Sequence, residues 1–463
     1  MKRKRQSGAL YGAGVFLAMG TAFAGGAMLK KSGTPQAKPI QPVRVAEASE
    51  GASSVHLTAP AGEASESLST FEEVYRRVEN EFTDALPSDT KLSQGAVSAM
   101  VASLEDPHSY FLNPAQRLLI DNEGKGKFAG IGAGLFLRAQ KTEGYTDFKI
   151  VIVAPLPGSP AAKAGLKPGD VITRIDNKYV LGYNPLIQYI KVVEKWQAKA
   201  VTDEELEKSR QATQTKITTG IPFAAAQMAL RGDATVKQLA GKTSYPVTVQ
   251  RPGVANPITV TITPGTTEVS PVSTKSLSGG AVQIKVAAFT DSAPSAVKEA
   301  LDKAPKGAGV VLDLRGNPGG TFPAAQKIAG MLVGAGPLVN EVRAGGKKTS
   351  IPATGTALGT RKVTVLVDKG TGSTAEAVAQ GLSERGATLA GTATFGDGVA
   401  QTLYKLDDGS GFTLTTGKLM SPKGIAWTGT GLTPKVAIAP GTPEDQVLAR
   451  AVATLATPVA EGK

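Results

Sequence analysis

The sequence contains no cysteine and only two histidines, His56 and His108, among its 463 residues. The lack of cysteine excludes disulfide bonds, thiolate metal ligands and cysteine nucleophiles. A Ser-His-Asp triad or a histidine-rich metal site would depend on those two histidines, so we expect neither. We also expect no cofactor and no bound metal.

Charge of one sign is not concentrated anywhere beyond the start of the chain. The formal net charge is +12, and Lys2, Arg3, Lys4 and Arg5 stand at the start with no acidic residue near them. The other basic residues are scattered, without an arginine-rich patch or interleaved aromatics. The sequence therefore predicts a solvated basic surface and no nucleic-acid binding.

Residues 1–31 are predicted to be a signal peptide or a membrane anchor. A basic start precedes an apolar run at 8–24, and the Ala-Phe-Ala at 22–24 is typical of a cleavage site. The apolar stretch continues to residue 29, which is long enough to cross a bilayer without cleavage. Either outcome predicts an exported protein, periplasmic or otherwise extracytoplasmic, and the second predicts anchoring to the inner membrane through residues 8–29.

Beyond this segment, residues 32–67 are rich in Ala, Pro, Ser and Glu and predict a flexible linker. From Leu68 the apolar spacing of "FEEVYRRVENEF" predicts a helix. From about residue 280 strand patterns such as "KVTVLVDKG" alternate with helix patterns such as "FPAAQKIAGMLV". This alternation is typical of a layered α/β domain.

Two turns that follow predicted strands carry the best candidates for chemistry. The first runs from Asp313 to Gly320 and is rich in glycine, which lets backbone N–H groups approach an anion. The second, from Gly370 to Glu376, places Ser373 at the first turn of a helix. The alternatives are plain turn geometry for the first and an ordinary N-cap serine for the second. Sequential strands of one sheet would bring both turns to the same edge.

Six motifs, taken together and in this order, resemble those of the carboxyl-terminal processing (tail-specific) serine peptidases. They are "KLSQGAVSAMVASLEDPHSYF", "GIGAGL…PGSPAAKAGLKPGDVITRID", "VVLDLRGNPGG", "VLVDKGTGSTAEAVAQGL", "GTATFGDGVAQ" and "GTGLTPKV". The second motif is similar to a PDZ domain. The resemblance covers about residues 68–440.

The resemblance implies an α/β multidomain chain in which a ClpP/crotonase-like layered α/β peptidase domain carries a PDZ-like β domain and an N-terminal helical segment. The predicted boundaries, in chain order, are 68–116 for the helical segment, 117–268 for the PDZ-like domain with a helical insertion at 186–220, 269–440 for the peptidase-like domain, and 441–463 for a C-terminal helix and tail.

In that family the nucleophile is a serine three residues before a glutamate, which Ser373 and Glu376 match. The resemblance implies that the oxyanion hole is built from the backbone N–H of Gly319 or Gly320 and that of Thr374.

The family's general base is a lysine in a segment resembling T-F-G-K-G-x-x-Q, with the glutamine orienting that lysine. Gln401 matches the glutamine, whereas the lysine position is occupied by Asp397. A carboxylate with an ordinary pKa near ~4 is a weak base at neutral pH. Its negative charge would also oppose the oxyanion. Four lysines lie close enough in sequence to substitute for the base: Lys369, Lys405, Lys418 and Lys423.

Two functions follow from these residues. The first is an extracytoplasmic serine-type peptidase that acts on protein C-termini by acyl transfer to Ser373. The alternative is a catalytically impaired homologue that serves as a peptide-binding adaptor or regulator, because Asp397 replaces the base.

The PDZ-like domain implies a second binding site, for the C-terminal peptides of extracytoplasmic proteins. Such domains bind a terminal carboxylate through backbone N–H groups and add the peptide as a strand. The candidate loop is Gly130, Ile131, Gly132 and Ala133, and the alternative is an ordinary strand-entry turn. His108 matches a fixed position of the family's N-terminal motif, and we predict a structural role for it.

Overall fold

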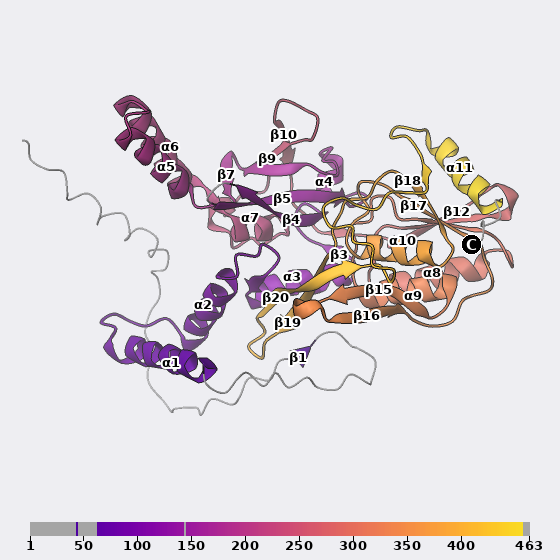
Figure 1. Ribbon diagram of the computed structural model, residues 1–463, viewed down its shortest axis with the longest axis horizontal. Helices are drawn as coiled ribbons and strands as arrows, with labels where there is room; N and C mark the ends of the chain where they lie inside the picture. Colours follow the sequence, from indigo (N-terminus) through magenta and orange to yellow (C-terminus); the bar gives the residue numbers. More distant parts are fainter. Residues whose placement is uncertain (1–42, 45–62, 143–144, 457–463) are drawn as a thin grey trace, which may run out of the picture. The chain divides into compact units, whose positions relative to one another are not determined.

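The computed structural model describes residues 43–44, 63–142 and 145–456 (Figure 1). The predicted signal or anchor at 1–31 lies outside these residues, as does most of the predicted linker at 32–67. Among the helices of the described segments, none combines the length and the apolar character needed to cross a membrane.

The N-terminal segment contains three helices. They are α1 (Glu63–Glu81), α2 (Asp89–Ala102) and α3 (Pro114–Gly124). Helix α1 begins five residues before the predicted start at Leu68, and the short strand β1 (Val43–Arg44) lies within the predicted linker. Helix α3 was not predicted. It is favoured by Asn113, which forms a capping box with Gln116, and by Pro114 at the first helical position.

The PDZ-like domain is built on a seven-stranded sheet in the order β10-β9-β6-β5-β4, with β7 beside β6 and β8 beside β7. Its strands are β4 (Ala133–Thr142), β5 (Tyr145–Pro155), β6 (Val171–Ile175), β7 (Lys178–Leu181), β8 (Ile221–Pro222), β9 (Tyr245–Gln250) and β10 (Ile258–Ile262). Strands β9 and β10 form an antiparallel hairpin. The helices α4 (Pro160–Lys163) and α7 (Phe223–Leu230) pack on the core of this sheet. The strands β3 (Lys127–Phe128) and β11 (Thr267–Glu268) pair at its boundary.

The charged stretch at 186–220 forms two helices, α5 (Pro185–Gln197) and α6 (Asp203–Thr219), which pair as a hairpin (Figure 1). A capping box of Thr202 and Glu205 starts α6, and Trp196 donates to Asp203 Oδ1 at 2.6 Å across the turn. Most side chains of both helices are exposed. This matches the predicted helical insertion.

The C-terminal α/β domain contains a six-stranded sheet in the order β12-β13-β14-β17-β18-β21, parallel except for β12. Its strands are β12 (Val272–Ser276), β13 (Val282–Val286), β14 (Val310–Asp313), β17 (Val363–Val367), β18 (Thr388–Gly391) and β21 (Val436–Ala437). Val310 and Leu312 pack with α8 (Ala293–Lys303), α9 (Phe322–Val333) and α10 (Thr374–Glu384). Val311, which points to the other face, packs with α11 (Glu444–Ala456). The alternation along one strand thus builds two layers of helix.

A second, mainly antiparallel sheet in this domain was not predicted. Its order is β1-β19-β20-β15-β16, and β2 (Tyr110–Leu112) joins β20. The strands are β15 (Gly336–Val342), β16 (Lys348–Ala353), β19 (Val399–Lys405) and β20 (Gly411–Met420). The loop that carries Asp397 leads directly into β19. The predicted fold class, an α/β multidomain chain with an N-terminal helical segment, is confirmed.

Candidate active site

Ser373 adopts a strained backbone conformation between β17 and α10, with φ 51° and ψ −123°. A non-glycine residue held there costs about 1–3 kcal/mol, and such strain concentrates at functional sites. Ser373 does occupy the predicted N-cap position of α10, with Glu376 at N3 accepting its N–H as in a capping box. Its dihedrals nevertheless differ from the extended values of an ordinary N-cap residue. The conformation is that of a strand-to-helix turn that presents a serine hydroxyl.

The carboxyl group of Glu376 anchors both segments of the site. Its Oε1 accepts from the Thr394 hydroxyl and from the Gly396 N–H at 2.7 Å. Its Oε2 accepts the N–H of Asp397 at 2.7 Å and that of Ser373 at 3.1 Å. Burial raises the pKa of Glu376, and the hydrogen bonds from Thr394 and Gly396 oppose that rise. The sequence motif marked Glu376 but did not reveal this anchoring role.

Asp397 is buried, with 6% of its surface exposed, and lies against Ser373. Burial raises the pKa of Asp397 to about 6, while hydrogen bonds from the Val399 N–H and the Ser373 side chain oppose the rise. Its Oδ1 accepts the Val399 N–H at 3.2 Å, and the Trp427 Nε1–H donates to its backbone oxygen at 3.3 Å. The expectation of an ordinary carboxyl pKa near ~4 is therefore wrong, because sequence position alone does not show burial.

The glycine turn lies directly against the serine. A Cβ at Gly319 would stand 2.9 Å from the Ser373 Cβ, so only glycine fits. The Gly319 N–H donates to Asn317 Oδ1 at 2.8 Å and is therefore engaged. Gly320 is exposed, and its carbonyl accepts the Thr374 hydroxyl at 2.8 Å. Of the predicted oxyanion donors, the N–H groups of Gly320 and Thr374 remain candidates.

Asn317, which was not predicted, ties the two turns together. It is fully buried, and its backbone oxygen accepts the Gly372 N–H at 3.0 Å. Its side-chain Nδ2 donates to the Val286 oxygen at 2.9 Å. The turn after β14 is thus bonded to the turn after β17 and to the end of β13.

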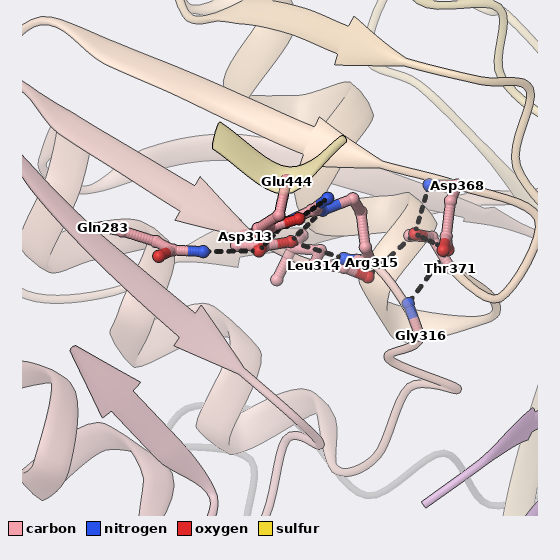
Figure 2. Close-up of polar contacts among 8 residues, drawn as sticks. All are labelled: Gln283, Asp313, Leu314, Arg315, Gly316, Asp368, Thr371 and Glu444. Carbon is pink, nitrogen blue, oxygen red and sulfur yellow. Dashed lines mark hydrogen bonds and ion pairs between the residues drawn. The ribbon is translucent and has the colours of Figure 1, made fainter. Parts of the chain in front are cut away.

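Further bonds between these two turns are drawn in Figure 2. The Thr371 hydroxyl donates to the Leu314 oxygen at 2.8 Å, and Asp368 Oδ1 accepts the Gly316 N–H at 2.9 Å. The expected meeting of the two turns at one sheet edge is confirmed, because β14 and β17 are parallel neighbours.

Arg315 connects the same edge to the C-terminal helix (Figure 2). Its guanidinium bonds to the fully buried Asp313 at 2.6 and 2.9 Å and to Glu444 of α11 at 2.8 and 2.9 Å. Gln283 donates to the second Asp313 oxygen at 2.8 Å. The buried carboxylate is therefore fully paired.

Gln401 does not contact Asp397 as the family pattern implies. Its Nε2 lies 3.2 Å from His108 Nδ1, and the residue is exposed on β19. His108 is buried, which lowers its pKa, and its ring lies 4.9 Å from that of Phe136. These contacts fit the predicted structural role of His108.

The four candidate substitute lysines are not buried at Ser373. Lys369, Lys418 and Lys423 are exposed, and Lys405 forms an ion pair with Asp121 at 3.3 Å. This leaves Asp397 as the titratable side chain beside that of Ser373.

In the PDZ-like loop, the Ile131 N–H donates to the Leu230 oxygen at 2.9 Å, and Ile131 itself is fully buried. The expectation that this N–H binds a carboxylate is wrong for this conformation, because it already has an acceptor. Gly130 packs so closely that a Cβ would lie 2.1 Å from the Leu230 oxygen. Gly132 and Ala133, at the entry to β4, remain as predicted donors.

The PDZ-like domain touches the glycine turn and the loop that carries Asp397. A Cβ at Gly134 of β4 would lie 2.1 Å from the Pro318 Cβ. The rings of Phe136 and Phe395 meet edge to face at 5.3 Å. The PDZ-like domain therefore packs against two segments of the candidate site.

Comparison with known proteins identifies the class. Residues 281–438 match the model of peptidase family S41, and residues 151–195 match that of the PDZ domain. The chain is 30% identical to the chloroplastic C-terminal processing peptidase of Tetradesmus obliquus over 355 residues, covering 74% of this chain and 68% of that one. It is 29% identical to the carboxy-terminal processing protease CtpA of Bacillus subtilis (strain 168), covering 78% of this chain and 67% of that one.

The structure agrees with this assignment. It superimposes on a solved structure of the photosystem II D1 C-terminal processing protease with a TM-score of 0.55 and 26% identity, over 84% of this chain and 91% of that one. The protein belongs to the C-terminal processing serine peptidases of family S41 and contains their PDZ domain.

Proposed function

We propose that this chain is an active serine-type peptidase that cleaves extracytoplasmic polypeptides near their C-termini, with Ser373 as nucleophile. The observation that supports this most directly is the strained backbone of Ser373, which Glu376 holds through a 3.1 Å hydrogen bond to the serine N–H. Such a conformation costs about 1–3 kcal/mol and is typical of a strand-to-helix turn that presents a nucleophile.

The proposed chemistry is acyl transfer. The Ser373 hydroxyl attacks the scissile carbonyl, and the N–H groups of Gly320 and Thr374 receive the oxyanion. The PDZ-like domain supplies the C-terminal recognition, through the N–H groups of Gly132 and Ala133. Export through residues 1–31, with or without anchoring, would give the enzyme extracytoplasmic substrates.

A second candidate is a peptide-binding adaptor without catalysis. Two observations favour it: Asp397 stands at the family's lysine position, and Gln401 bonds to His108 and not to that position. The full chain incubated with an unfolded protein separates the two functions. Cleavage that disappears in Ser373→Ala supports the peptidase, and intact substrate over pH 4 to 10 supports the adaptor.

A further inference from the structure

The base that would activate Ser373 is the open chemical question of this site, because the family's lysine is absent. We propose that Asp397 is the general base: its carboxylate takes the proton of the Ser373 hydroxyl and returns it to the leaving amine. This inference rests on the proposed peptidase function and names the residue that makes it work.

The position of Asp397 relative to Ser373 is held by one oxygen atom. Oε2 of Glu376 accepts the backbone N–H of both residues, at 2.7 and 3.1 Å. On the other side of the loop, the Trp427 Nε1–H donates a hydrogen bond to the backbone carbonyl of Asp397. Glu376 is thus a positioning residue that fixes nucleophile and base together, which is what proton transfer requires of their geometry.

The side chain of Asp397 is arranged to accept a proton. The Val399 N–H donates to Oδ1 at 3.2 Å. The Ser373 side chain lies close enough to the same carboxyl group to oppose the rise in its pKa. Among the described residues, no other side chain donates a hydrogen bond to this carboxylate, so the serine proton can move directly to it. An aspartate that served only to cap its own turn would not need the contact with Ser373.

The basicity of this carboxyl is suited to the task. Burial raises its pKa to about 6, close to the ordinary histidine value of about 6.5. Histidine is the commonest general base because that value lies near the working pH. An aspartate at its ordinary pKa near ~4 would lie more than about two pKa units below histidine and would be a correspondingly weaker base.

The charge of Asp397 does not oppose the oxyanion during the step. The Ser373 Oγ–carbonyl carbon bond forms while the proton passes to Asp397, so the carboxylate becomes a neutral acid as the carbonyl oxygen becomes negative. When the C–N bond breaks, the acid gives that proton to the amine and leaves the acyl-Ser373 ester. Water then repeats the transfer to Asp397 and releases the carboxylic acid and free Ser373.

The charged neighbours of the Asp397 loop are few. Glu376 of α10 is bonded to the loop backbone, Arg138 of β4 lies 5.9 Å from the Phe395 ring, and Lys418 of β20 is exposed in register with Val399. Burial raises the pKa of Glu376 to about 8 and that of Asp397 to about 6, so the two carboxyls titrate as a coupled pair in which Asp397 ionises first. The rate should therefore rise through about pH 6, as Asp397 ionises, and level off above about pH 9, once Glu376 has ionised too.

The test uses the purified full chain, an unfolded protein substrate and a fluorophosphonate probe for activated serines, from pH 4 to 10. We expect Ser373-dependent cleavage with half-maximal rate near pH 6. Asp397→Asn keeps the acceptor for the Val399 N–H and should lose at least ~10² in rate. Asp407→Asn, an exposed change of the same chemistry, should leave the rate unchanged.

The outcomes distinguish a failure of the Asp397 assignment from a failure of the proposed peptidase function. Ser373-dependent cleavage that survives in Asp397→Asn, or that shows no rise in rate near pH 6, overturns the assignment of Asp397 and leaves the peptidase function standing. A parent that neither cleaves nor reacts with the probe at any pH overturns both. Activity that appears only in Asp397→Lys also overturns both, since it shows a site disabled by the aspartate.

Discussion

The backbone N–H of Asp397 donates to Oε2 of Glu376 at 2.7 Å, so the aspartate is held by its main chain and its carboxyl stays available for Ser373. The backbone of Asp397 therefore determines where the residue lies, and its side chain determines the chemistry. This arrangement also implies that substitutions at Asp397 can change the chemistry without releasing the loop.

Burial of Asp397 predicts a pH-dependent cost to stability. Its pKa rises from 3.8 in the unfolded chain to about 6 in the folded one, so the folded state is favoured below about pH 4 and loses that advantage as pH rises through about 6. Two units correspond to about 3 kcal/mol. Asp397→Asn should therefore unfold at higher urea concentration than the parent at pH 7.5, and at the same concentration at pH 4. A constant difference across this range would contradict the shift.

Glu376→Gln is expected to destabilise the fold by roughly 3 kcal/mol and to abolish cleavage. Four donors face the carboxyl, and an amide would turn its own N–H groups toward some of them. Thermal unfolding and cleavage assays measure the two effects. Glu299→Gln, an exposed change on α8, serves as control and should stay within about 0.5 kcal/mol. Equal stability of the two variants would indicate that Glu376 is protonated in the folded state.

Arg315→Ala should lower the free energy of unfolding by about 3 kcal/mol, because it leaves the fully buried Asp313 without its guanidinium. The matched change Glu444→Gln removes the other partner, whose side chain is 57% exposed. It should cost less than about 1 kcal/mol. Urea unfolding measures the loss of unfolding free energy in both variants. Equal losses would mean that the contact of Arg315 with Glu444 on α11, and not that with Asp313, supplies most of the stabilisation.

Replacing residues 184–219 with a short Gly-Ser linker should leave the thermal midpoint nearly unchanged. Gly220 packs against Leu181, so the ends of the excursion are already adjacent, and most of its side chains are exposed. Met228→Ala in the buried helix α7 is the contrasting change, expected to cost about 2–5 kcal/mol. Collapse of folding in the deletion would show that α5 and α6 carry core packing.

A peptide with a free C-terminal carboxylate should bind more tightly than its C-terminal amide, since the N–H groups of Gly132 and Ala133 would read the negative charge. Calorimetry with Ser373→Ala, which leaves the peptide intact, measures both affinities. Equal affinities would show that this loop does not recognise the C-terminal carboxylate.

The sequence predicted those parts of the fold that depend on local pattern. The strands β13, β14 and β17 and the helices α8, α9 and α10 follow from apolar periodicity and glycine punctuation, and parallel neighbours necessarily carry their turns to one edge. Ser373 could be placed for the same reason.

Features that depend on contacts between distant segments were missed. The antiparallel sheet of β15, β16, β19 and β20 is rich in Gly, Thr and Lys, which hides its alternation. The pairing of Gln401 with His108 joins residues 293 positions apart. The basicity of Asp397 comes from burial, which no motif records.

The hydrogen bonds made by Asn317 also have a consequence for local motion. Its backbone oxygen and its Oδ1 hold the amides of Gly372 and Gly319, one from each turn. Neither amide can be released while Asn317 stays in place, so both should exchange with deuterium in a single opening event and at matched rates. The turns at 313–320 and 370–376 therefore form one cooperative unit, which opens as a whole or stays closed.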